Sequence, residues 1–123
     1  MATLTPSLSL VSAAGDVASD ALSFTVTDSL NVTTPTTGVS RQSIATGSAQ
    51  DVLASNSAFS YIFIRNASSS NAAAFLQIKL GGNAVIRLDV EEFAFIPIYS
   101  GLTVQAEAHT AACVLEFARF SKA

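Results

Sequence analysis

At 123 residues the chain is long enough for one domain core with an added arm, but not for two independent cores. Half of the residues are hydrophobic, yet no run approaches the roughly 20 apolar residues of a membrane-spanning helix, so we expect no membrane insertion. The first residues lack the basic segment of a signal peptide, so we do not expect classical secretion. The net charge of −3, with 12% charged residues and no basic run, argues against nucleic-acid binding.

Residues 1–38 differ in composition from the rest of the chain. They contain fourteen Ser or Thr, three Asp and no Lys or Arg, and they hold all of the net charge. Large apolar residues alternate here with Ser or Thr, which is the period of a strand with one apolar face. Tracts rich in Ser and Thr can also stay disordered. The alternation favours an ordered, extended N-terminal arm.

Such an arm needs an apolar partner, because isolated strands with one apolar face are marginally stable. Adding an extended strand to a neighbouring sheet would satisfy its backbone hydrogen bonds and bury its apolar side chains in one step. We therefore predict that the arm joins copies of the chain. The side chains expected in that interface are Leu8, Leu10, Leu22, Phe24 and Val26.

Residues 39–123 form the second predicted region, in which turn residues recur at the short intervals typical of a sandwich or small barrel. Gly81-Gly82-Asn83 predicts a tight hairpin, because these residues tolerate positive φ angles. Eight strands in this region fit a jelly roll or another two-sheet sandwich. The sequence thus predicts an all-β chain with one antiparallel, jelly-roll-like β-sandwich after the arm. The predicted strands cover residues 39–46, 50–54, 59–66, 73–80, 84–90, 93–98, 102–108 and 112–120.

Residues able to support chemistry are few. His109 is the only side chain with an ordinary pKa near neutral pH, but no motif surrounds it, so we interpret it as a solvated loop residue. Cys113 lies in an apolar run and is predicted to be buried. One Cys and one His exclude an intrachain disulfide and the usual zinc sites. Asn31 and Asn66 begin glycosylation sequons, which occur often by chance. We expect no catalytic residue and no cofactor.

Charged residues cluster before the run that starts at Phe93. Asp89, Glu91 and Glu92 offer oxygen ligands for calcium, but their spacing is not that of an EF-hand loop. Charges that protect a strand edge from pairing explain them better. Arg65 and Arg87 interrupt apolar strands, so each is expected to face solvent or to pair with an acid such as Asp89 or Glu92.

Four stretches of the chain are informative together: Thr3-Leu-Thr-Pro-Ser-Leu-Ser-Leu, Ala21-Leu-Ser-Phe-Thr-Val-Thr-Asp-Ser-Leu, Tyr61-Ile-Phe-Ile-Arg-Asn-Ala-Ser and Glu92-Phe-Ala-Phe-Ile-Pro. They resemble small structural proteins of tailed bacteriophage virions, those of marine cyanophages above all. The resemblance implies a capsid decoration, or cement, protein. Such a protein is a β-sandwich on the outer surface of the virion, commonly a trimer, that ties neighbouring major capsid subunits together. It implies no catalytic residues.

Two other functions remain open at this stage. A fibre, knob or tail module for host attachment would share the sandwich and the oligomeric state, but would display aromatic residues on loops. A sugar-binding domain of a secreted enzyme would carry Trp or Tyr platforms, whereas this chain has no Trp and two Tyr. In each case the low charge density leaves apolar surface for contact with other chains, so we expect a homo-oligomer.

Overall fold

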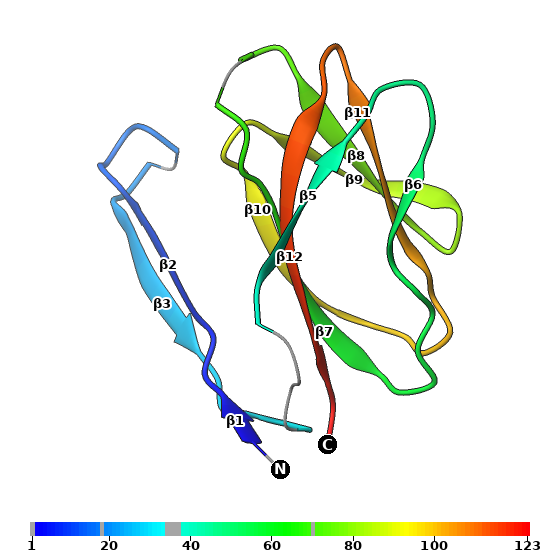
Figure 1. Cartoon of the computed structure of the whole chain (residues 1–123). Coiled ribbons are helices and arrows are strands. Elements are labelled where there is room, and N and C mark those ends of the chain that lie inside the picture. The colour runs from blue at the N-terminus through cyan, green and yellow to red at the C-terminus, as the bar shows by residue number, and fades with distance from the viewer. Residues whose placement is uncertain (1, 18, 34–37, 70) are drawn as a thin grey trace. The chain divides into compact units, whose positions relative to one another are not determined.

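The computed structural model describes residues 2–17, 19–33, 38–69 and 71–123, and all of its regular elements are β-strands (Figure 1). The chain separates into two compact units. Unit 1 comprises residues 1–34 together with Ala123, and unit 2 comprises residues 35–122. No helix in the described ranges is long and apolar enough to cross a membrane.

Unit 2 contains eight strands, and each coincides with a predicted strand to within two residues at either end. Residues 104–109, which include Ala106 and Ala108, form a strand rather than a helix, because the alternating pattern outweighs the helix propensity of alanine. The strands are β5 (Ser40–Ile44), β6 (Gln50–Leu53), β7 (Ser60–Asn66), β8 (Phe75–Leu80), β9 (Asn83–Asp89), β10 (Phe93–Ile98), β11 (Val104–His109) and β12 (Cys113–Ser121).

These strands form two four-stranded antiparallel sheets, in the orders β10-β7-β12-β5 and β6-β11-β8-β9 (Figure 1). Connections between consecutive strands of this unit pass from one sheet to the other, except the β8–β9 hairpin, which stays within one sheet. This strand order is that of a jelly roll, in which eight strands form two Greek keys. The predicted jelly-roll-like sandwich is confirmed.

The core lies between the inner faces of the two sheets, and burial alternates strictly along β7 and β11. In β7, Ile62 and Ile64 are fully buried, and the intervening side chains face outward. Across the core, Leu76 and Ile78 of β8 are also fully buried. Alternation on facing sheets buries one side of these central strands, which is the packing that stabilises a sandwich. The remaining core residues are Ile44, Ala74, Leu88, Ile98, Val104, Ala106, Ala108, Cys113 and Leu115.

The β8–β9 turn shows why two glycines occur together at this point. Gly81 and Gly82 both have positive φ, of 59° and 85°, and Leu80 pairs with Asn83 across them. A two-residue turn with both angles positive matches the twist of a hairpin. A Cβ atom at Gly81 would also lie 3.0 Å from Leu102 Cδ2. The predicted hairpin is confirmed, with Asn83 as the first residue of β9.

Unit 1 folds back on itself. Its strands are β1 (Ala2–Leu4), β2 (Ser7–Ser12), β3 (Leu22–Thr27) and β4 (Leu30–Val32); β1 pairs with β4 and β2 with β3, both antiparallel. The register is the same in both pairs. Leu4 lies opposite Leu30, and Ser7, three residues after Leu4, lies opposite Thr27, three residues before Leu30. Residues 2–12 and 22–32 therefore follow one register, and we call these two segments the N-terminal hairpin. The strands of the predicted arm thus pair with one another within the arm.

Candidate functional site

The N-terminal hairpin has two chemically different faces. In an antiparallel pair, residues directly opposite each other point to the same side. Ser7 lies opposite Thr27 with their hydroxyl oxygens 3.1 Å apart, and the Thr25 hydroxyl donates to Ser9 Oγ at 3.4 Å. These residues define a hydroxyl face, which also carries Val11.

The other face of the hairpin is apolar and contains all five predicted interface residues. Leu8 lies opposite Val26, Leu10 lies opposite Phe24, and Leu22 lies opposite Ser12. Four of these side chains, those of Leu8, Leu10, Phe24 and Val26, are between 40% and 56% exposed, and Leu22 is half-buried. The structure therefore places the five residues on one surface, which we call the apolar hairpin face.

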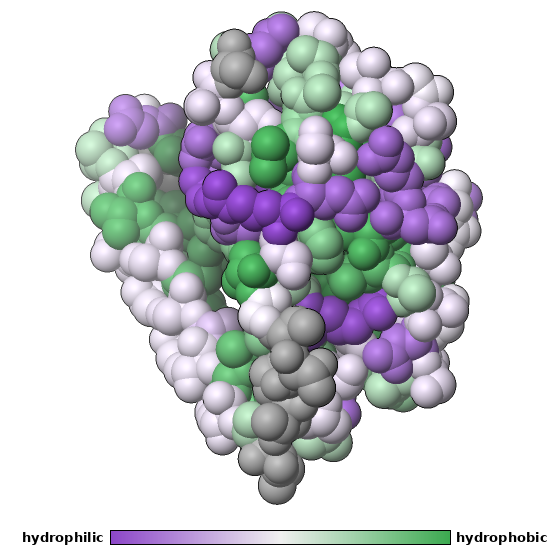
Figure 2. Space-filling model, viewed as in Figure 1, coloured by the Kyte–Doolittle hydropathy of each residue, from purple (hydrophilic) through white to green (hydrophobic). Residues whose placement is uncertain are grey.

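The same face continues past the residues that the sequence singled out. Leu4 and Leu30 lie opposite each other in the β1–β4 pair, and the shared register gives them the parity of Leu8 and Val26. Both are half-buried. Figure 2 shows hydrophobic residues over part of this unit, beside weakly polar residues. Leu4 and Leu30 belong to the same alternation of apolar residues with Ser or Thr, and this alternation was the signal in the sequence for these two additional positions.

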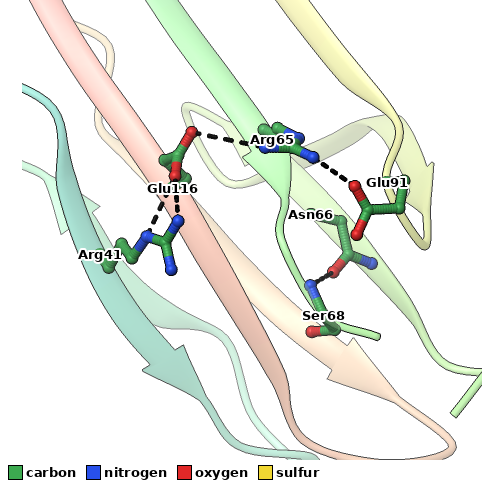
Figure 3. Close-up of polar contacts among 6 residues, drawn as sticks. All are labelled: Arg41, Arg65, Asn66, Ser68, Glu91 and Glu116. Carbon is green, nitrogen blue, oxygen red and sulfur yellow. Dashed lines mark hydrogen bonds and ion pairs between the residues drawn. The ribbon is translucent and has the colours of Figure 1, made fainter. Parts of the chain in front are cut away.

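A row of charged side chains crosses the outer face of the β10-β7-β12-β5 sheet (Figure 3). Arg41 Nη2 lies 2.9 Å from Glu116 Oε2, Arg65 Nη1 lies 3.9 Å from Glu116 Oε1, and Arg65 also pairs with Glu91. Arg65 therefore pairs with acids other than Asp89 or Glu92. Since the pairs are partly exposed, each contributes little to stability, and the row is best explained as cross-strand pairing on a solvated surface.

Asn66, the first residue of one glycosylation sequon, has a structural role in the sandwich. The Asn66 side chain is fully buried; its Nδ2 donates to Leu88 O at 3.1 Å, and its Oδ1 accepts from Ser68 N at 3.2 Å (Figure 3 shows the second bond). A buried amide nitrogen that already donates a hydrogen bond cannot accept a glycan while the sandwich is folded. Asn66 instead links β7 of one sheet to β9 of the other.

The two residues with potential for catalysis lie in unrelated places. His109 stacks on Phe75 with ring centroids 4.8 Å apart, and its Nε2 is buried without a hydrogen-bond partner in the described part of the chain. This packed position differs from the solvated loop predicted for His109. Cys113 is buried, as predicted, with its Sγ 3.6 Å from Ala111 O. Among the described residues, neither His109 nor Cys113 contacts a group that would activate it, so these two residues do not form a nucleophile and base pair.

The acidic residues near Phe93 are each engaged with the protein. Asp89 Oδ1 accepts from Arg87 Nε at 2.9 Å, Glu92 Oε2 accepts from the backbone N of Asp89 at 2.8 Å, and Glu91 pairs with Arg65. They lie around the turn between β9 and β10, which are edge strands of different sheets. Among the residues that the structure describes, no three His, Cys, Asp or Glu side chains are grouped so that they could hold a metal ion.

An aromatic surface that sequence reasoning missed lies at one end of the sandwich, where β10 ends and β7 begins. Phe59 and Tyr99 lie just outside these strands, with ring centroids 5.8 Å apart and planes tilted by 58°. Together with Pro97, Ile98 and Lys122 they line a hollow of 310 Å³. We call these five residues the aromatic corner.

Comparison of the chain with protein-family models, with curated proteins and with solved structures finds no match.

Proposed function

We propose that this chain is a non-enzymatic virion structural protein, specifically a capsid decoration or cement protein. It binds the outer capsid surface as a homo-oligomer, most simply a trimer, and stabilises contacts between major capsid subunits. The observation that carries this proposal is the apolar hairpin face, which is exposed and belongs to a unit separate from the sandwich.

Elementary energetics favour a binding role for that face. Burying a Val, Leu or Phe side chain contributes about 1.5 to 3 kcal/mol, and Leu8, Leu10, Phe24 and Val26 are all exposed. A two-stranded hairpin is marginally stable alone and gains stability when a second layer covers its apolar side. Burial against another protein chain would supply this layer, as a cement protein requires.

The sandwich supports the same function as a rigid body. Jelly rolls recur in viral capsid and lectin domains, so the topology is compatible with a virion component, although a fold alone does not determine function. Unit 2 has its own core, and its charged side chains largely pair with one another on the outer surfaces of the sheets. The proposal therefore assigns the contact between chains to the apolar hairpin face, where four exposed apolar side chains lie together.

A host-attachment module of a fibre, knob or tail is the second candidate, and one observation favours it. Such a module would carry exposed aromatic residues on loops, and Phe59 and Tyr99 lie outside the strands, 49% and 76% exposed. The two candidates differ in which surface binds the partner: the apolar hairpin face for a cement protein, the aromatic corner for an attachment module.

Pelleting with capsids tests the proposal. Capsid shells assembled from the major capsid protein of the same virus are incubated with the protein and sedimented, and the bound protein is quantified. We expect Val26→Ser, on the apolar hairpin face, to reduce capsid binding, because it weakens the oligomer whose copies engage neighbouring capsid subunits. Val11→Ser, the same substitution on the hydroxyl face, should leave capsid binding unchanged. No pelleting of the intact protein with such shells, or equal binding by the two variants, would contradict the proposed role.

A further inference from the structure

The aromatic corner has the features of a binding site that the decoration function does not use. Tyr99 is the most exposed of the aromatic side chains among the described residues, and its ring meets that of Phe59 at an angle, so the two rings form adjoining walls. Pro97 and Ile98 continue the surface from β10, and the buried Ile98 gives it a firm base. We propose that the aromatic corner binds an acidic pyranose sugar, with the ring stacked on Tyr99 and the carboxylate at Lys122.

Backbone hydrogen bonds hold the corner in place. Lys122 N donates to Phe59 O at 2.8 Å, and Gly101 N donates to Asn56 O at 2.7 Å. The Asn56 side chain accepts from Ala58 N at 2.9 Å. The end of β12, the start of β7 and the end of β10 are thereby joined at the lower end of the sandwich in Figure 1. A preformed surface of this kind binds without the cost of ordering a loop.

The charge of the corner selects the ligand. Among the described residues, Lys122 is the only charged one that lines the hollow. Its Nζ lies 4.8 Å from the ring centroid of Tyr61 and 6.0 Å from that of Phe59. The two rings hold the ammonium group by cation–π attraction. Among the described residues no carboxylate forms an ion pair with Lys122. A ligand carboxylate can therefore neutralise it, which favours an anionic ligand over a neutral one.

The shape of the corner favours a sugar over an apolar molecule. One face of a pyranose ring presents C–H groups that pack against the electron-rich face of an aromatic ring, while its hydroxyls stay in water. The hollow of 310 Å³ is near the lower limit for small-molecule sites, roughly 300 Å³, so it holds one or two sugar rings. Because the aromatic walls are exposed, a fully apolar ligand would keep much of its surface in water and would gain little binding free energy.

Nuclear magnetic resonance titration of the intact, isotope-labelled protein tests the site. The probes are D-glucuronic acid and D-glucose, whose rings differ at one carboxylate. We expect glucuronate to shift the amide signals of Phe59, Tyr99 and Lys122, with an affinity at least about threefold above that for glucose. Tyr99→Ala should weaken glucuronate binding at least about tenfold, and Tyr99→Phe should preserve most of it. Lys122→Met keeps the aliphatic stem and should remove the preference for glucuronate.

Phe93→Ala is the matched control, since Phe93 is also an exposed aromatic residue but does not line the hollow. It should leave binding unchanged, and thermal unfolding should show that each variant is folded. The proposal is overturned if neither sugar shifts the corner, if both bind equally, or if Tyr99→Ala binds as well as the parent. Capsid binding depends on the apolar hairpin face, so Val26→Ser should leave the titration unchanged, and either proposal can fail without the other.

Discussion

Leu10 lies directly opposite Phe24 in the N-terminal hairpin, and both side chains are exposed. Cross-strand apolar pairs normally form because a second layer of the same protein covers them. This pair, with Leu8 and Val26 beside it, is left with substantial apolar surface in contact with water. The relationship is the physical reason to expect that this protein works in an assembly.

The two faces of the hairpin allow a matched test of self-association. Full burial of a Val side chain contributes about 1.5 to 3 kcal/mol, and Val26 is 56% exposed, so an interface would gain roughly half of this amount. Because each 1.4 kcal/mol is a factor of ten, we expect Val26→Ser to weaken the homo-oligomer at least about threefold. Val11→Ser, on the hydroxyl face, should leave the association constant unchanged. Sedimentation equilibrium of both variants measures the difference. If Val11→Ser dissociates the oligomer as strongly as Val26→Ser, the contact surface is not the apolar hairpin face.

Asn66 is expected to stabilise the sandwich through its bond to the opposite sheet. Asn66→Ala should lower the free energy of unfolding by at least about 2 kcal/mol, because it leaves Leu88 O and Ser68 N without these partners in a buried site. Asn71→Ala is the matched control: Asn71 Oδ1 also accepts from the backbone N two residues on, at 3.0 Å, but in an exposed turn. Urea unfolding measures both. Equal losses for the two variants would show that the turn, and not the link between sheets, provides the stability.

Arg119 is expected to cost stability rather than provide it. The residue lies opposite the buried Ile62; its Nη1 donates to Ala54 O at 2.6 Å, but its Nε and Nη2 are buried without hydrogen-bond partners in the described residues. Buried donors without a partner lower stability and offset the gain from the hydrogen bond to Ala54 O. Arg119→Met should therefore raise the urea midpoint of unfolding. A clear fall in the midpoint would show that the guanidinium stabilises the folded protein.

The pH dependence of this effect has a defined sign. Desolvation by burial lowers the pKa of Arg119 in the folded protein. The unfolded chain therefore holds this proton more tightly than the folded chain. The charge disfavours folding at every pH below both pKa values, and this penalty is lost as the pH rises through the lowered pKa of the folded protein. Below that lowered pKa, the stability difference between Arg119→Met and the parent should not change with pH. Unfolding curves at several pH values check this.

The fold of the sandwich could be predicted in outline because its strands obey local rules. Alternation in β7 and β12 and the glycine pair before Asn83 placed strands and turns without reference to distant residues. The order of strands in the sheets could not be derived in this way. It depends on long-range pairing, such as that of β7 with β10 and β12, and eight strands of similar character are compatible with several sandwich topologies.

The apolar hairpin face and the aromatic corner differ in how far the sequence predicts them, because the first depends on local alternation and the second on long-range pairing. A period of two places Leu8, Leu10 and Phe24 on one side of a strand whatever their partner is, so the apolar hairpin face followed from the sequence. The aromatic corner did not, because Phe59 and Tyr99 are forty positions apart. They meet only because Ser60 pairs with Ile98 at the ends of β7 and β10. Two aromatic residues, each next to the end of an apolar run, were the available signal.

Sedimentation velocity of the intact chain and of residues 39–123 tests the central claim, that the hairpin joins chains while the sandwich supplies a rigid body. The intact protein should sediment as an oligomer, most simply a trimer. The truncated protein should sediment as a monomer that still unfolds cooperatively, because the sandwich core lies within unit 2. A truncated chain that keeps the mass of the intact oligomer would show that the hairpin does not join the subunits, and one that is unfolded would show that the hairpin completes the core of its own sandwich.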